Sequence, residues 1–116
     1  MTIQDYDNYM LVRYEDSRFD SRTAPVFRKT MNARIGKKIA PPKAVILDLH
    51  GVNFIDLSGL GAILSVMQPV QKKTKLLLCG AEENVRNIFS VTHLDSIFKM
   101  YQNAEEAAKA VPMTVN

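Results

Sequence analysis

An α/β fold with a mostly parallel central sheet and about four helices is predicted by three features of the sequence. Short apolar runs at Val45–Leu47 and Leu76–Leu78 are typical of parallel strands that are buried on both faces. Segments with the period of helices separate these runs, so strands and helices alternate along the chain. Before them, the residues from Ile3 to Tyr14 carry strand-favouring types around a turn at Asp7-Asn8. We therefore expect a hairpin to begin the sheet and the order β-β-α-β-α-β-α-β-α.

The first helix is predicted to begin at Thr23, because Pro25 lies close behind it, where proline is favoured. Pro41-Pro42 should end this helix, since proline cannot donate the helix hydrogen bond and clashes with the preceding turn. The connection before the helix is polar except for Phe19, which we expect to be anchored in the core. The buried side of the helix is expected to carry apolar residues at helical spacing: Ala24, Phe27, Met31, Ile35 and Ile39.

The segment from Ala44 to Gln71 combines a strand, a turn and a second helix. Its strand should end near Leu49, and after a turn at residues 51–53 the pair Phe54-Ile55 should return to apolar surroundings. Ser58 lies where the helix begins, and Pro69 should bend or shorten that helix near its end. The side of the helix that faces the core is predicted to carry Leu60, Ile63, Leu64 and Met67.

The remaining elements continue the alternation. A second buried strand is predicted at Lys75–Cys79 and a short strand at Ile97–Tyr101. Between them, Glu82-Glu83 suits the first turn of a helix, because the helix dipole favours acidic residues there. Asn103, with Glu106 as its capping-box partner, should start a last, alanine-rich helix, and the tail from about residue 112 is expected to fray. The inward residues of the third helix are predicted to be Val85, Ile88 and Phe89.

The composition indicates one soluble globular domain over residues 1–116, with 47% apolar and 23% charged residues. No apolar run approaches the roughly 20 residues that a membrane helix needs, and the N-terminus lacks a signal pattern. We therefore expect a cytoplasmic protein without direct membrane insertion. The net charge of +3 is mild, and no aromatic residues are interleaved with the basic groups, so no nucleic-acid partner is expected.

Residues that could carry catalysis or bind a metal form no recognised pattern in the sequence. The two histidines, His50 and His93, stand alone, without a second histidine or a cysteine at ligand spacing. Cys79 ends an apolar strand, which favours a packed and unreactive thiol. The segment Gly59-Leu60-Gly61 lacks the Gly-Lys-Ser/Thr ending of a phosphate-binding loop. We therefore expect no enzyme activity, no metal and no cofactor.

Ser58 is the position where a small covalent change has the clearest consequence. Its hydroxyl can cap the first turn of the helix, a role worth about 1 kcal/mol. The hydroxyl can instead be a phosphorylation site, because the positive end of the helix dipole tolerates an anion. A phosphate would add about two negative charges beside Asp56 and change a surface that a partner reads. The residues alone leave both interpretations open.

The segment NFIDLSGLGAIL, residues 53–64, resembles the signature of STAS domains, and of the anti-sigma-factor antagonists within that family. In that signature an acidic residue and a phosphorylatable serine precede Gly-Leu at the start of a helix. The segment SRFDSRTAP, residues 17–25, is similar to the family's Arg/Glu-Leu-Asp segment before the first helix. Residues 84–110 resemble the family's C-terminal helix, strand and helix, so the similarity extends from Tyr9 to Ala110.

This resemblance implies a STAS-like fold and a non-enzymatic regulator of transcription in a partner-switching pathway. The unphosphorylated protein would bind an anti-sigma factor that is also a serine kinase with a histidine-kinase-like ATPase fold. Phosphorylation of Ser58 would end that binding, and a PP2C-type phosphatase would restore it. Leu57 stands where the family often has a second serine, which leaves Ser58 as the one acceptor in the motif. The residues expected at or near the partner surface are Asp20, Ser21, Asp56, Leu57, Gly59 and Leu60.

The same resemblance allows a second function. STAS proteins also serve as accessory subunits of membrane transporter complexes, and in such a subunit Ser58 would be only a helix cap. The two hypotheses differ in one observable property, because only the switch requires a phosphate on Ser58.

Overall fold

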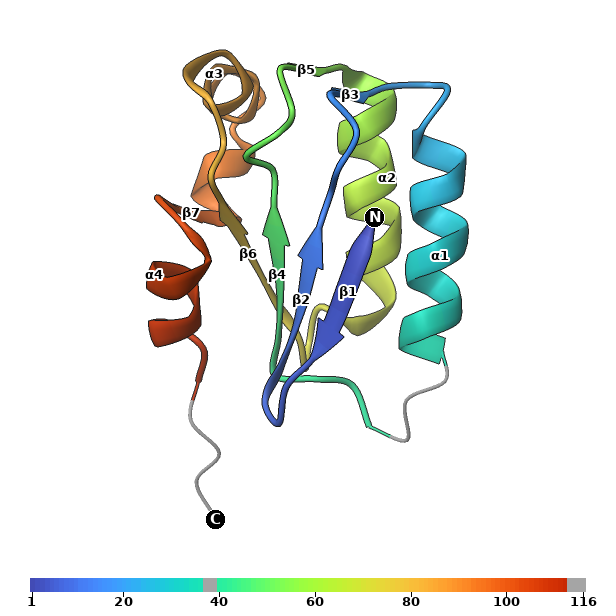
Figure 1. Ribbon diagram of the computed structural model, residues 1–116, viewed down its shortest axis with the longest axis vertical. Coiled ribbons are helices and arrows are strands. Elements are labelled where there is room, and N and C mark those ends of the chain that lie inside the picture. The colour runs from blue at the N-terminus through green and yellow to red at the C-terminus, as the bar shows by residue number, and fades with distance from the viewer. Residues whose placement is uncertain (37–39, 113–116) are drawn as a thin grey trace.

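A five-stranded sheet forms the centre of the computed structural model, which describes residues 1–36 and 40–112 (Figure 1). Its strands are β1 (Thr2–Asp5), β2 (Tyr9–Arg13), β4 (Ala44–Asp48), β6 (Lys75–Cys79) and β7 (Lys99–Tyr101). The strand order is β1-β2-β4-β6-β7, and every neighbouring pair is parallel except β1 and β2, which form an antiparallel hairpin. The two apolar runs of the sequence therefore lie in the interior of the sheet.

Helices cover both faces of this sheet. They are α1 (Ala24–Gly36), α2 (Leu57–Met67), α3 (Glu83–Val91) and α4 (Ala104–Lys109). α1, α2 and α3 enclose the larger core with side chains of one sheet face, among them Val12, Leu47 and Leu78. α4 packs Ala107 against the other face, beside Ile46. Two short 3-10 helices, η1 (Gln68–Val70) and η2 (Leu94–Ser96), follow α2 and α3.

The predicted α/β class, the mostly parallel sheet and the four helices are confirmed. All five residues of β4 are buried, as expected of a strand with helices on both sides. Pro69 lies in η1, and α2 ends at Met67, because proline cannot donate the next helix hydrogen bond. Asn103 caps α4, where its side-chain oxygen accepts a hydrogen bond from the Glu106 N–H at 2.9 Å.

Some expectations fall on residues that the structure does not describe. They concern Ile39 on the inward side of the first helix and the tail residues 113–116. α1 itself extends to Gly36, upstream of Pro41-Pro42, and its inward residues Ala24, Phe27 and Met31 are buried.

The last strand begins at Lys99 rather than at Ile97. Residues Leu94–Ser96 form η2, and Ile97 closes this turn as its C-cap, so its backbone is not extended. Ile97 and Phe98 are residue types that favour strands, but here they follow η2 in the turn that returns the chain to the sheet.

A second sheet of two short strands is an addition to the predicted order. β3 (Arg18–Phe19) and β5 (Phe54–Ile55) pair in parallel, with Arg18 opposite Phe54 and Phe19 opposite Ile55. A strand of two residues is too short to show an alternation of polar and apolar types. This pairing joins the segments that lead into α1 and α2 (Figure 1).

Two side chains that were expected in the core are exposed. Phe54 is 38% exposed, because Ile55 takes the inward direction and successive strand residues point to opposite faces. Leu64 is 40% exposed, because α2 turns the stripe that contains Ala62 and Val66 toward the core. The prediction of Leu64 as an inward residue is therefore wrong, and the buried stripe of α2 is rotated toward its small side chains.

Candidate functional site

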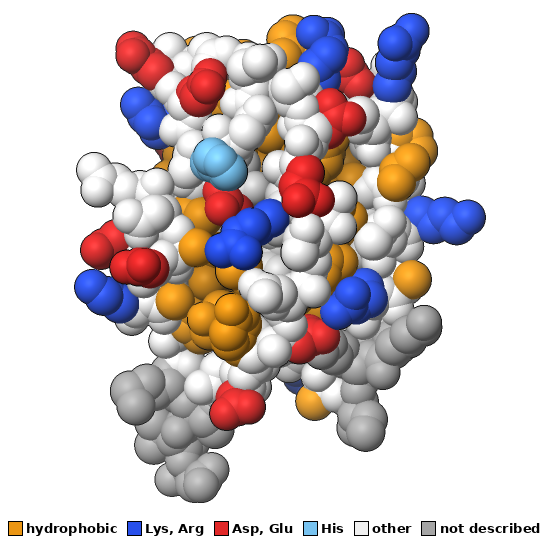
Figure 2. All heavy atoms as spheres, viewed as in Figure 1, with side chains coloured by type: hydrophobic (Ala, Val, Ile, Leu, Met, Phe, Trp, Pro, Cys, Tyr) orange, Lys and Arg blue, Asp and Glu red, His pale blue; other side chains and the backbone are white. Residues whose placement is uncertain are grey.

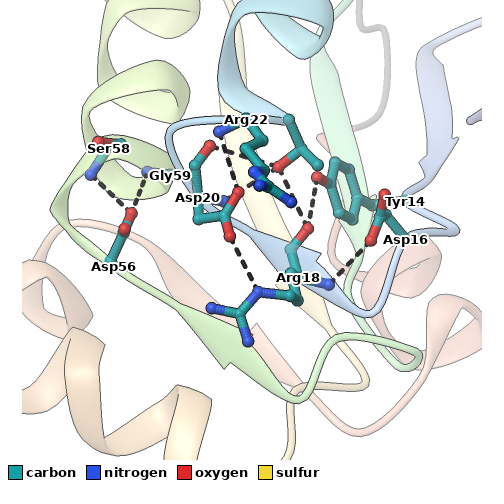
Figure 3. Close-up of polar contacts among 9 residues, drawn as sticks. Tyr14, Asp16, Arg18, Asp20, Arg22, Asp56, Ser58 and Gly59 are labelled. Atoms are coloured by element: carbon teal, nitrogen blue, oxygen red, sulfur yellow. Dashed lines mark hydrogen bonds and ion pairs between the residues drawn. The ribbon is translucent and has the colours of Figure 1, made fainter.

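Asp56 is the residue that caps α2. Its carboxylate oxygen Oδ1 accepts hydrogen bonds from the backbone N–H groups of Ser58 at 2.9 Å and Gly59 at 3.1 Å (Figure 3). The backbone of Asp56 is extended and lies just outside the helix, which is the usual geometry of an N-cap residue. The interpretation of Ser58 as the cap is therefore wrong, because the serine already lies inside the helix, after Leu57.

The hydroxyl of Ser58 is left free by this arrangement. The residue is exposed, and its side chain makes no hydrogen bond to any residue that the structure describes. It lies in the first turn of α2, where the positive end of the helix dipole favours an anion. The structure thus presents an accessible hydroxyl oxygen in the first turn of a helix whose N-cap hydrogen bonds are accepted by Asp56 and not by this hydroxyl.

Asp20 organises the loop before α1. Its carboxylate accepts hydrogen bonds from Arg18 Nε at 2.9 Å and from the Arg22 N–H at 3.0 Å, while its own N–H donates to Thr23 Oγ1 at 3.0 Å. The hydrogen bond from Arg18 holds the pKa of Asp20 below its usual value. Asp20 is therefore a buried, ionised partner of Arg18, while the neighbouring Ser21 is exposed.

The β3–β5 pairing holds this loop beside the start of α2 (Figure 3). The Asp56 N–H donates to the carbonyl oxygen of Phe19 at 3.3 Å. The Arg18 guanidinium lies 4.1 Å from the centre of the Phe54 ring, a cation–π contact that also crosses the two strands. Two segments that are far apart in the sequence therefore form one continuous surface.

Gly59 sets how closely α2 approaches β3. A Cβ atom at this position would overlap the carbonyl oxygen of Phe19 and would lie 2.9 Å from Ile55 Cγ1. Leu60 follows in the core, 3% exposed. Leu57, on the side of the helix away from Gly59, is 76% exposed although it is a large apolar side chain. The first turn of α2 therefore has a buried side that fixes its position and an exposed apolar side next to Ser58.

A cluster of three aromatic side chains, Tyr14, Phe19 and Phe27, packs against the loop before α1. The Tyr14 hydroxyl donates a hydrogen bond to the Arg18 carbonyl oxygen at 2.8 Å. Its ring stacks on Phe19 with 4.2 Å between ring centres, and Phe27 of α1 contacts both rings edge-on. Burial raises the pKa of Tyr14 above its ordinary value, so the hydroxyl remains a donor at neutral pH. Phe19 is fully buried here, which confirms its predicted role as an anchor.

The predicted site residues divide into two groups by their placement. The residues at least partly exposed on the surface are Ser21, Asp56, Leu57 and Ser58, and the buried ones are Asp20, Gly59 and Leu60. Arg18 and Phe54 belong to the same surface but were missed. No local pattern in the sequence could have found them, because the pairing of two-residue strands brings them together.

A separate group of polar side chains lies at the carboxyl ends of β4 and β6. Asp48 Oδ1 accepts a hydrogen bond from the His50 N–H at 3.0 Å, and Asp48 Oδ2 lies 3.8 Å from Arg13 Nε. Burial, helped by the nearby Asp48 carboxylate, raises the pKa of Cys79 to about 12, so the thiol stays protonated at neutral pH. Among the described residues, no three His, Cys, Asp or Glu side chains are grouped so that they could hold a metal ion.

The charged side chains on the face shown in Figure 2 are of both signs and are interspersed. Within residues 1–36 and 40–112, no helix has the length and apolar composition needed to cross a membrane.

The candidate functional site is the surface formed by the first turn of α2 and the loop before α1.

Replacing Asp56 with alanine is expected to lower the free energy of unfolding by about 1 kcal/mol, because two backbone N–H groups lose their acceptor. Asp56→Asn keeps a side-chain oxygen and should retain most of that stability. Urea unfolding of both variants measures the difference. Equal stability of Asp56→Ala and the wild type would contradict the capping role.

The fold and the site define a small α/β domain in which an exposed serine follows the cap of a central helix. The family model described as STAS domain matches residues 1–107. The chain belongs to the STAS domain family.

Relatives of the chain include anti-sigma factor antagonists. BtrV of Bordetella bronchiseptica, which carries that name, is 33% identical over 69 residues. This match covers 59% of the chain and 60% of BtrV, so less than two thirds of that relative's length is spanned. The sequence relationship supports the predicted type of STAS protein.

Solved structures agree in fold. An anti-sigma factor antagonist from Mycobacterium paratuberculosis has a TM-score of 0.82 at 24% identity, covering 95% of this chain and 91% of that one. The antagonist SpoIIAA in its unphosphorylated form has a TM-score of 0.78 at 19% identity, over 99% and 98% of the two chains. SpoIIAA of Bacillus in its phosphorylated form has a TM-score of 0.70 at 18% identity, over 96% and 98%. At these identities the likeness confirms the STAS-like fold.

Proposed function

We propose that this chain is a non-enzymatic regulatory protein of a partner-switching pathway. The unphosphorylated form binds an anti-sigma factor that is also a serine kinase with a histidine-kinase-like ATPase fold. Phosphorylation of Ser58 ends this binding, and a PP2C-type phosphatase restores it. The observation that carries the proposal is the exposed Ser58 hydroxyl, which has no hydrogen-bond partner among the described residues and lies in the first turn of a helix that Asp56 caps.

The free hydroxyl suits phosphoryl transfer. The γ-phosphoryl group of ATP would move to Ser58 Oγ, ADP would leave, and the hydroxyl proton would pass to a base of the kinase. Hydrolysis by the phosphatase would return the hydroxyl and release inorganic phosphate. Neither step removes a hydrogen bond from α2, because the cap is the Asp56 carboxylate. The proposal places the protein in the cytoplasm, where ATP and the kinase are available.

The phosphate would change the surface more than the fold. It adds a charge of about −1.5 to −2 at neutral pH. The helix dipole tolerates this charge at the N-terminal turn of α2, while the Asp56 carboxylate lies close to the same turn. A partner patch that covers Ser58 and Leu57 would have to desolvate both anions, so association should weaken. SpoIIAA, whose fold is similar, has been solved in both phosphorylation states, which supports the proposal.

The proposed roles of the other site residues follow from their placement. Leu57 and Ser21 are exposed and would contact the partner directly. Gly59 and Leu60 are buried, and we assign them the role of holding the first turn of α2 in position. Asp20 would act in the same indirect way through its ion pair with Arg18.

The direct test is the intact mass of the protein isolated from its own cells under contrasting growth conditions. We expect a fraction that is heavier by one phosphate, with the modification mapped to Ser58 by fragmentation. A Ser58→Ala chain expressed in the same cells is the control and should stay unmodified. Persistent absence of phosphate, also after loss of the candidate phosphatase, would overturn the proposal and favour the transporter-subunit alternative.

A further inference from the structure

A groove of about 700 Å³ lies at the other end of α2 from Ser58. We call it the α2–β7 groove. Four buried apolar residues are among those that line it: Met67, Leu76, Leu77 and Phe98. Leu76 and Leu77 belong to the cores on opposite faces of the sheet, so the groove lies at the sheet edge. One side of the groove is formed by the last turn of α2 and the start of η1, and the other by the segment that leads into β7, by β7 itself and by Ala110 after α4. The groove has the size of many ligand and peptide sites.

Two large apolar side chains that line this groove are exposed. Leu64 on α2 is 40% exposed, and Ile97 before β7 is 65% exposed. Single exposed apolar residues are ordinary, but these two border a groove that is also lined by the polar residues Gln68, Gln71 and Thr74. A concave surface that combines apolar side chains with a few polar groups is typical of binding sites. Leu64, which was predicted to be buried, is therefore one of the exposed residues that line the α2–β7 groove.

The charge of the groove is positive. Lys75 and Lys99 line it and are exposed, and no acidic residue is among the described residues that line it. Lys72 and Lys73 precede Lys75 in the chain and are also exposed. A ligand that fills this groove should therefore combine apolar groups with negative charge.

The groove is separate from the proposed switch. Ser58 and Met67 are at opposite ends of α2, roughly 14 Å apart along the helix at its normal rise per residue. Figure 1 shows the N-terminal end of α2 beside β5 and its C-terminal end at the far end of the sheet. A partner at one end can therefore bind without covering the other.

We propose that the α2–β7 groove is a docking site for an acidic segment of a partner protein that carries several apolar side chains. The apolar side chains of the segment lie against Leu64, Ile97 and the buried apolar residues that line the groove, and its carboxylates lie near Lys75 and Lys99. Binding at the groove does not depend on the phosphorylation state of Ser58. This property distinguishes the groove from the surface of the proposed switch, and the two proposals can fail independently.

The test is a selection from a display library of random peptides against the full chain, followed by affinity measurements on the enriched peptides. We expect enriched peptides to contain acidic and large apolar residues. Their binding should weaken at least about tenfold for Ile97→Gln and for Lys99→Gln. The first substitution removes an apolar side chain from the groove and the second removes a positive charge. Ser58→Asp should bind them as the wild type does.

The control is Val91→Gln, which removes another exposed apolar side chain, one that does not line the groove. All four variants change exposed residues, so thermal melting should confirm that each is folded. The proposal is overturned if no peptide is enriched, if the enriched peptides are basic, or if their binding survives the Ile97 and Lys99 substitutions. It is also overturned if Val91→Gln or Ser58→Asp weakens binding as much as Ile97→Gln does.

Discussion

Gly59→Ala is expected to lower the free energy of unfolding by about 3 kcal/mol or more, the upper part of the range for overpacked sites. The added methyl group would overlap the carbonyl oxygen of Phe19 and press on Ile55. Neither neighbour can move freely, because both belong to the β3–β5 pairing. Urea unfolding measures the loss, and hydrogen exchange of the Asp56 and Ser58 amides shows whether α2 has moved.

Gly61→Ala is the matched control in the same helix. A Cβ atom at residue 61 would meet nothing within 4 Å. This variant should therefore gain about 0.5–1 kcal/mol, the usual difference between glycine and alanine inside a helix. If Gly59→Ala proved as stable as Gly61→Ala, the assigned role of Gly59 in the approach of α2 to β3 would be wrong.

Ser58→Asp is expected to weaken binding to the proposed anti-sigma factor partner at least about a hundredfold, which corresponds to roughly 3 kcal/mol. The reason is the burial of an added anion next to the Asp56 carboxylate when the partner covers the first turn of α2. Ser58→Ala should bind within a few-fold of the wild type, since the hydroxyl bonds to none of the described residues. Isothermal titration calorimetry against each histidine-kinase-like anti-sigma factor of the same genome measures both.

Ser65→Asp serves as the charge control for this experiment. Ser65 is also exposed on α2 but lies two turns further along the helix. An equal added charge there should leave partner binding close to that of the wild type. Equal affinities of Ser58→Asp and Ser58→Ala for every candidate partner would exclude a switch at this serine.

The order of strands and helices was predictable because the sheet is parallel and covered on both faces. β4 and β6 lie between helices, so their residues must be apolar on both sides, and an uninterrupted apolar run is visible in the sequence. The end of α2 was also predictable, because Pro69 acts on the backbone locally.

The sequence predicted correctly that Ser58 lies near the start of a helix, but it did not show which residue caps that helix. Asp56 and Ser58 both have side chains that cap helices, and they lie within two residues of one helix start. The choice between them depends on where the helix begins, and sequence patterns place helix ends only within a few residues. The structure begins α2 at Leu57, which makes Asp56 the cap and frees the serine.

Local residue types and spacing were enough to predict the alternation of elements, the parallel sheet, the buried anchor Phe19 and the location of the serine motif. The surface around that serine could not be predicted in this way, because it depends on how distant segments pack together. The β3–β5 pairing places Arg18 and Phe54 beside the first turn of α2, and the rotation of α2 exposes Leu64. These features arise from contacts between segments distant in the chain, and such contacts leave no periodic trace in the sequence.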